Sequence, residues 1–251
     1  MTLLAVERIK LFTTRSPWWC SAVTLAVTIG FAALIVGTAG DEIPITVRVT
    51  QFGYSFGLAV VMVLAALAVT TEYRFGTIRT TFQAVPNRTA ALLAKTGVVA
   101  LLALALGEIA AFGSWALANV IRPQDDLALN TVAEWTNVAG VGPVYALTAV
   151  IAVAVGILVR HSAGAISILL IYTLAAESLV QLIPNVGDDI HKWLPFNVAD
   201  KFLTGGMAGA GGEGPPVSTS ALSAGWALAY FAGFALVMLV IALTTANKRD
   251  A

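Results

Sequence analysis

The sequence predicts an all-α polytopic membrane protein with six transmembrane helices. Apolar residues make up 58% of its 251 residues and charged residues only 11%. A soluble domain carries about 25% charged residues, because its surface must be wetted. The chain also contains six apolar stretches close to the ~20 residues that a helix needs to cross the hydrocarbon core. This composition excludes an ordinary soluble enzyme, and a net charge of zero leaves no basic surface for nucleic acid.

The six apolar stretches are expected to be helices, because backbone polar groups in lipid must be satisfied within the segment itself. The single cysteine, Cys20, excludes a disulfide framework within the chain and any metal site built from several cysteines. In chain order, the predicted spans are residues 18–37, 52–71, 91–118, 138–159, 163–182 and 221–244.

Lysine and arginine concentrate on one side of these predicted spans. With six spans, ten of the fourteen fall on the side that holds both termini. Cytoplasmic loops of multi-pass proteins carry the excess of Lys and Arg. The distribution therefore predicts a multi-pass protein of the plasma (inner) membrane with cytoplasmic N- and C-termini. The ten residues are Arg8, Lys10, Arg15, Arg74, Arg79, Arg88, Lys95, Arg160, Lys248 and Arg249.

Two further segments have apolar patterns outside the spans. In residues 1–17, Leu3, Val6 and Ile9 lie near one face of a possible helix, which predicts an amphipathic helix at the inner interface. Residues 183–220 form the longest outer segment, and their first part is too apolar and aromatic for a free loop. We expect short helices that lie on the outer leaflet or dip into it.

The cytoplasmic segment 72–86 joins the second and third predicted spans. Pro86 is expected to end a short amphipathic helix there. On these residues alone, two interpretations stay open: a helix that binds a partner, or a positive loop that only sets topology. The predicted apolar side consists of Tyr73, Phe75, Ile78 and Phe82.

This segment resembles a motif of a known transporter family. It reads Glu72-Tyr73-Arg74-Phe75-Gly76-Thr77-Ile78-Arg79, followed by Pro86-Asn87-Arg88 and Ala94-Lys95. The order resembles the Glu-Tyr/Phe-x-x-Gly-Thr-x-Arg, Pro-x-Arg and Ala-Lys pattern of membrane (permease) subunits of ATP-binding-cassette exporters of the type-2 permease superfamily. Near the N-terminus, the residues that resemble the leader of actinobacterial multidrug and antibiotic-export permeases are Glu7, Lys10, Arg15, Ser16, Trp18 and Trp19.

The resemblance implies one transmembrane permease domain over residues 1–251, which forms half of a dimeric substrate pathway. Its partners would be ATP-binding-cassette ATPase subunits, a second permease copy or sister permease, the lipid bilayer and a small amphipathic substrate. The chain itself would hold no cofactor, since ATP and Mg would be bound by the partner ATPase. The implied ATPase-coupling residues are Glu72, Tyr73, Arg74, Gly76, Thr77 and Arg79. The implied outer gate in segment 183–220 consists of Trp193, Leu194, Pro195 and Phe196.

Two carboxyl groups fall inside predicted spans. Glu108 lies near the middle of the third span, and Glu177 about two-thirds of the way along the fifth. A carboxyl group in hydrocarbon is costly unless it is neutral, paired or hydrated, so intramembrane acids are functional candidates by default. With Trp115, they are the candidate substrate-pathway residues. The alternative is a structural role, in which each carboxyl group is protonated and hydrogen-bonds to a neighbouring helix.

The sequence shows no nucleotide-binding loop and no His-Glu-x-x-His pair, so neither catalytic residues nor a metal site are expected in this chain. We therefore expect a permease subunit that is not itself an enzyme. Three rival functions remain: an ion- or proton-coupled carrier using Glu108 and Glu177, an intramembrane enzyme using the same pair, and a structural scaffold. A carrier predicts inverted repeats with broken helices at matching positions, and the sequence shows neither.

Overall fold

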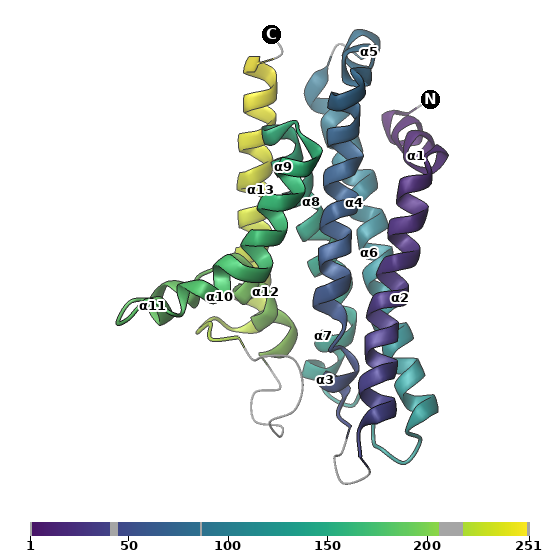
Figure 1. The fold of residues 1–251 in the computed structure, drawn as a ribbon, viewed down its shortest axis with the longest axis vertical. Helices are drawn as coiled ribbons and strands as arrows, with labels where there is room; N and C mark the ends of the chain where they lie inside the picture. Colours follow the sequence, from purple (N-terminus) through teal and green to yellow (C-terminus); the bar gives the residue numbers. More distant parts are fainter. Residues whose placement is uncertain (1, 41–44, 86, 206–217, 250–251) are drawn as a thin grey trace.

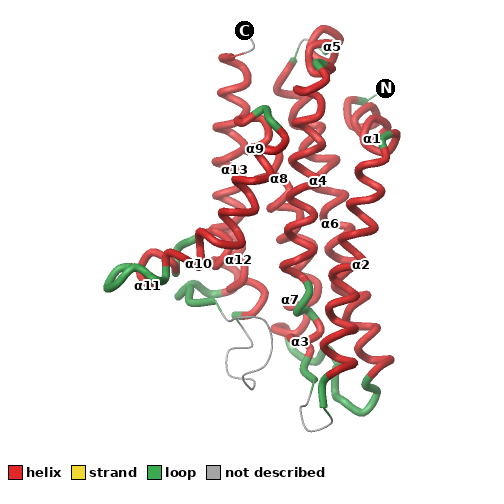
Figure 2. The backbone as a smooth tube through the Cα atoms, viewed as in Figure 1, coloured by secondary structure: helices red, strands yellow, loops and turns green. Residues whose placement is uncertain are grey.

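The computed structural model describes residues 2–40, 45–85, 87–205 and 218–249. Within these ranges the chain is helical and contains no strand, as the sequence predicts. Figure 1 shows an elongated bundle, and Figure 2 shows that short loops join its helices.

Among the described residues, six helical segments are long and apolar enough to cross a membrane, which agrees with the predicted number and places of the spans. The second span joins a short helix, α3 (Val47–Thr50), to α4 (Tyr54–Phe75) through a turn. The fifth comprises α9 (Ser162–Ile171), a π-helical turn η1 (Tyr172–Ala176) and α10 (Glu177–Val180). The remaining spans are α2 (Arg15–Thr38), α6 (Arg88–Ile121), α8 (Val141–Val159) and α13 (Ala224–Arg249).

Helices also occupy the segments that flank the spans. At the N-terminus lies α1 (Leu3–Thr13), and α5 (Thr77–Ala84) follows α4 directly. The remaining short helices are α7 (Val132–Ala139), α11 (Gly187–His191) and α12 (Pro195–Thr204).

Several boundaries differ by a few residues from those predicted, and two of them have a clear local cause. The segment 1–17 is not one unit, because the backbone is extended at Thr14 and α2 already begins at Arg15. The fourth span begins at Val141 rather than at residue 138, because Gly140 separates it from α7. In both places a local backbone feature sets the boundary, which apolar content alone does not reveal.

The central helix of the bundle is α8. It packs against α4, α6 and α13, and it is apolar on all sides, as expected for a helix surrounded by protein. Its approach to α6 depends on two glycines that face each other. A Cβ atom on Gly107 would lie 2.7 Å from the Cα of Gly142, so a side chain there would force the helices apart.

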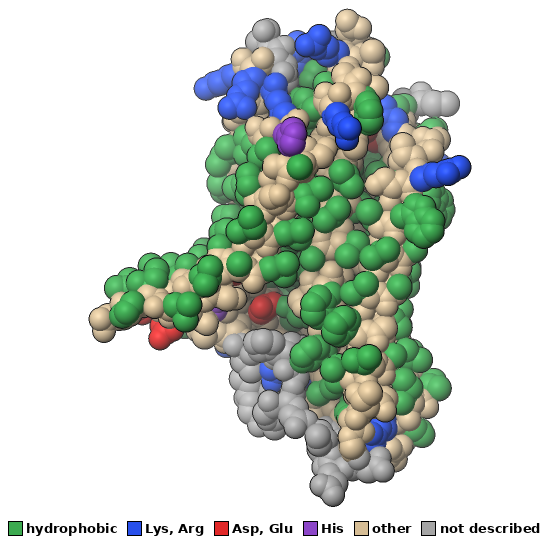
Figure 3. Space-filling view, viewed as in Figure 1, with side chains coloured by type: hydrophobic (Ala, Val, Ile, Leu, Met, Phe, Trp, Pro, Cys, Tyr) green, Lys and Arg blue, Asp and Glu red, His purple; other side chains and the backbone are tan. Residues whose placement is uncertain are grey.

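Both termini lie at the same end of the bundle, and α5 lies there too (Figure 1). Basic side chains gather at this end, above a largely hydrophobic surface (Figure 3). We call it the basic end. At the other end lie α3, α7 and α12, while α10 and α11 extend away from the bundle.

Candidate functional site

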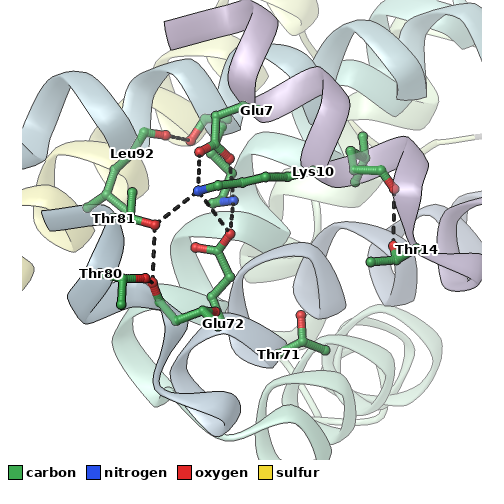
Figure 4. Close-up of polar contacts among 12 residues, drawn as sticks. Glu7, Lys10, Thr14, Thr71, Glu72, Thr80, Thr81 and Leu92 are labelled. Carbon is green, nitrogen blue, oxygen red and sulfur yellow. Dashed lines mark hydrogen bonds and ion pairs between the residues drawn. The ribbon is translucent and has the colours of Figure 1, made fainter. Parts of the chain in front are cut away.

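Four charged side chains meet at the basic end, and we call them the inner charge cluster: Glu7, Lys10, Glu72 and Lys95. The Nζ atom of Lys95 lies 2.5 Å from Oε2 of Glu7 and 2.8 Å from Oε1 of Glu72. The Nζ atom of Lys10 lies 2.8 Å from Oε1 of Glu7 and 3.6 Å from Oε1 of Glu72. Figure 4 shows Glu7, Lys10 and Glu72 pointing toward one another. The cluster therefore links α1, α4 and α6.

Local structure positions each member of the cluster. Glu7 and Lys10 are three residues apart on α1, so they share one helix face. Glu72 lies in the last turns of α4, and Lys95 lies in the second turn of α6. The Nζ atom of Lys10 also donates a hydrogen bond to Oγ1 of Thr81, at 2.9 Å. This bond extends the cluster to α5.

Burial and charge oppose each other at Glu7. Its side chain is 5% exposed, and that of Lys95 is 7% exposed. Burial disfavours the ionised carboxylate, but the ammonium groups of Lys95 and Lys10 outweigh this effect and hold the pKa of Glu7 below its usual value. Glu7 is therefore ionised at neutral pH, and its partners compensate the buried charge.

The segment implied to couple with an ATPase contains a helix break. Gly76 adopts the left-handed conformation, with φ of 72°, and this ends α4 before α5 begins. A side chain would be strained at this φ value, which explains why glycine suits the junction. Thr77 is the first residue of α5.

The side chains of this segment face different surroundings. The ring of Tyr73 lies 5.0 Å beneath the guanidinium of Arg160, and Ile78 is buried. Arg74 lies over the ring of Phe75 and is exposed, as is Arg79. Of the implied coupling residues, Arg74, Thr77 and Arg79 are thus accessible to a partner, while Glu72 bonds within its own chain.

The predicted apolar side of the segment is wrong at one position. Phe75 is 71% exposed and does not share a buried face with Ile78. A continuous helix would have placed the two on neighbouring positions of one face. The turn at Gly76 changes the helix direction between them, so the helical spacing no longer applies.

Glu108 lies at the contact between α6 and α8. It is partly buried, and its carboxylate lies where a side chain on Gly142 would otherwise be. Glu108 makes no hydrogen bond or ion pair with another described residue. Trp115 lies two turns further along α6, and its indole Nε1 donates to the carbonyl oxygen of Leu127 at 2.8 Å. The sequence-predicted pathway role of both residues stays a prediction.

Glu177 binds the N-terminus of α12. Its carboxylate oxygens accept hydrogen bonds from the backbone N–H groups of Phe196 at 3.1 Å and Asn197 at 2.9 Å. The first N–H groups of a helix have no partner within the helix, and a carboxylate also interacts favourably with the helix dipole there. Glu177 is 5% exposed and lies far along the chain from Glu108. Glu177 is thus an acceptor at the start of α12, and its sequence-predicted pathway role stays a prediction.

The four implied gate residues form the entry to α12. Leu194 precedes the helix, Pro195 is its first residue, and Phe196 is buried against the ring of Phe231, with centroids 5.6 Å apart. Trp193 is half-exposed, and its carbonyl oxygen accepts a hydrogen bond from the hydroxyl of Tyr230 at 2.8 Å. These residues are thereby held against α13.

Sequence reasoning missed two polar groupings. The ion pairs of Lys95 were missed, although a lysine inside a 34-residue apolar helix is a signal that a partner is needed. The second is at α12, where the amide of Asn197 donates to the carbonyl oxygen of His191 at 2.8 Å and Nδ1 of His191 lies 2.8 Å from Oγ1 of Thr219. No periodic pattern of residues predicts these contacts.

Within the described ranges, no group of three His, Cys, Asp or Glu side chains is placed to hold a metal ion. No protein-family model matches the chain, and no curated protein matches it. The class follows from the fold itself: the described part of the chain is that of an α-helical membrane protein, with six helices long and apolar enough to span the bilayer.

Proposed function

We propose that the chain is the transmembrane subunit of an ATP-driven exporter, which forms a substrate pathway as a dimer and couples to separate ATPase subunits. The cargo is a drug, an antimicrobial or a lipid-like amphipathic molecule. The observation that carries the proposal is the inner charge cluster together with α5. This short helix lies beyond the last turn of a membrane span, and its exposed residue Arg79 belongs to the motif described above.

The contacts of α5 fit the transmission of movement. α5 continues from α4 through Gly76 and is bonded to α1 through Lys10 and Thr81. The cluster bonds α1 and α4 to α6 through Lys95. A partner that displaces α5 would therefore act on three helices as one body, which is the kind of rigid-body movement that switching proteins use.

Transport further requires that the two conformations differ in affinity for cargo. Glu108 is the proposed contact for cargo on this chain, because its carboxylate is partly exposed and makes no bond to another described residue. Glu177 is proposed instead to hold α12, the helix next to the proposed outer gate. On this proposal the chain supplies the pathway, and ATP hydrolysis takes place on the partner.

The first prediction is that an ATPase co-purifies with the chain from its native membrane in mild detergent. The test variant is Arg74→Ala with Arg79→Ala, because both side chains are exposed and neither belongs to the inner charge cluster. We expect this double variant to lower the ATPase activity in the eluate by about tenfold or more, as the loss of one to two charged contacts implies.

The matched control is Arg8→Ala with Lys248→Ala, which removes two exposed positive charges from the same end of the bundle. We expect it to retain the ATPase. Equal losses in both variants would point to general charge attraction. A wild-type chain that is recovered intact without any ATPase would contradict the proposed function and favour a carrier or a scaffold.

A further inference from the structure

A cavity of about 800 Å³ opens beside the inner charge cluster, and we call it the inner cavity. Its walls come from α1, the start of α2, α4, α5 and α6. Pockets of 300–1,000 Å³ are typical of sites for small molecules. Glu108, Trp115 and Glu177 do not line it, so it is separate from the proposed pathway residues.

The lining of the inner cavity is divided by polarity. Toward the basic end it is charged and rich in hydroxyl groups, with Thr14, Thr71 and Thr80 beside the cluster (Figure 4). Away from that end the lining is apolar and includes Leu64, Leu67, Ala68, Val98 and Val99. An occupant that fits both parts must itself have a polar head and an apolar tail.

The depth of the cavity matches one leaflet. Along α4 the lining runs from Phe75 back to Leu64. Eleven residues at 1.5 Å per residue correspond to about 16 Å along the helix. The hydrocarbon core is about 30 Å thick, so this distance covers about half of it. The length suits an acyl chain that starts at the headgroup level.

The charges of the lining favour an anionic head. Lys10 and Lys95 are paired with the two carboxylates of the cluster. The third cation, Arg15, is exposed and has no hydrogen-bond or ion-pair partner among the described residues. Its guanidinium fits phosphate through two parallel hydrogen bonds. Thr13 and Ser16 line the cavity beside it, and the Thr13 hydroxyl donates to the carbonyl oxygen of Lys10 at 3.0 Å. The lining thus carries one positive charge in excess.

We propose that the inner cavity binds an anionic phospholipid, with the phosphate at Arg15 and one acyl chain along α4 and α6. Basic pockets between membrane helices on the cytoplasmic side are a recurring form of lipid recognition. The bound lipid would fill the space between α1 and the bundle. This inference does not depend on the proposed function, because lipid binding requires neither ATPase nor cargo.

The test uses the purified full-length chain in detergent micelles. Binding of fluorescently labelled phosphatidylglycerol is measured by anisotropy and compared with phosphatidylcholine of the same acyl chains. We expect phosphatidylglycerol to bind about tenfold more tightly or better, and Arg15→Gln to abolish this preference. Equal affinity of the wild-type chain for both lipids would overturn the proposal.

The matched control is Arg8→Gln, which removes an equivalent exposed charge from α1 outside the cavity lining. We expect it to keep the preference within twofold. Equal losses in Arg8→Gln and Arg15→Gln would show non-specific attraction and overturn the site. Ala68→Phe fills the apolar part, and we expect it to weaken both lipids while the chain still elutes as a single species. Unchanged lipid affinity in this variant would place the lipid elsewhere.

A final arm separates a lipid from a soluble anion. Glycerol 3-phosphate, which has the phosphate but no acyl chain, is added as a competitor. We expect that glycerol 3-phosphate does not displace labelled phosphatidylglycerol when the two are present at equal concentration. Displacement at those concentrations would show a site for soluble phosphate compounds and contradict the acyl-chain part of the proposal. Because no ATPase takes part, failure here leaves the proposed function untouched.

Discussion

Lys95 illustrates, at the scale of single residues, how a charge is retained inside an apolar helix. Its ammonium group lies between the carboxylates of Glu7 and Glu72. Removing water from an ion costs several kcal/mol, and a close pair of opposite charge offsets that cost only when the geometry is good. The buried pair is therefore sensitive to the loss of either partner rather than a large net source of stability.

We expect Lys95→Met to lower the free energy of unfolding by about 3 kcal/mol or more, because Glu7 then keeps a buried charge with only Lys10 beside it. The double variant Glu7→Gln with Lys95→Met is expected to lose less than the sum of the single variants. Titration with a denaturing detergent measures the free energy of unfolding of each variant. The control is the exposed Lys248→Met, which should change the free energy by about 0.5 kcal/mol at most.

The same pair has a defined pH dependence. The pKa of Glu7 is lower in the folded chain than in the unfolded one, so its stabilising effect is complete above the unfolded pKa and is lost as pH falls through the folded pKa. The detergent titration repeated at acid pH should therefore show a loss of stability that Glu7→Gln lacks. The assigned pairing would be contradicted if the free-energy changes of the single variants were additive and the wild-type chain lost no stability at acid pH.

At the scale of elements, the N-terminus of α12 is capped by a side chain from another helix. Glu177, at the end of the fifth span, supplies the acceptor for its first free N–H groups. The π-helical turn η1 immediately precedes Glu177. A π turn adds one residue to a helical turn and rotates everything beyond it, so it sets the direction in which Glu177 points.

We expect Glu177→Ala to increase hydrogen exchange at the amides of Phe196 and Asn197 by about tenfold or more, since each of the two lost hydrogen bonds is worth about 0.5–1.5 kcal/mol. Glu177→Gln should give an intermediate value, because its amide oxygen still accepts one hydrogen bond. The control is Asp189→Ala, on the neighbouring α11 and 73% exposed. Unchanged exchange in Glu177→Ala would mean that the carboxylate does not hold α12.

At the scale of the whole molecule, the six spans bring both termini and α5 to one end of the bundle (Figure 1). The basic residues gather at that end. Because Lys and Arg are enriched on the cytoplasmic side of membrane proteins, this arrangement favours a cytoplasmic location for the inner charge cluster and α5.

The orientation is tested with single-cysteine variants in intact cells. Cys20 is first changed to Ser, and Lys248→Cys or Glu134→Cys is then introduced at opposite ends, where Lys248 is exposed and Glu134 is partly exposed. We expect a membrane-impermeant thiol reagent to label Glu134→Cys from outside and Lys248→Cys only after the cells are opened. The reverse pattern would place the basic end outside and contradict the proposed coupling to a cytoplasmic ATPase.

Hydrophobic length and charge distribution act over whole segments, so the amino-acid sequence is enough to predict the helical membrane class, the six spans and the basic end. Which side chains meet depends on how the helices pack, and only the structure shows it. Glu7, Glu72 and Lys95 come from three helices far apart in sequence, and no periodic pattern records such contacts. The same holds for Glu177: apolar content places it in a span, but only the position of α12 supplies its two hydrogen-bond donors. Whether a segment is apolar enough to span the membrane follows from its composition, whereas the partner of a buried charge depends on how the helices pack.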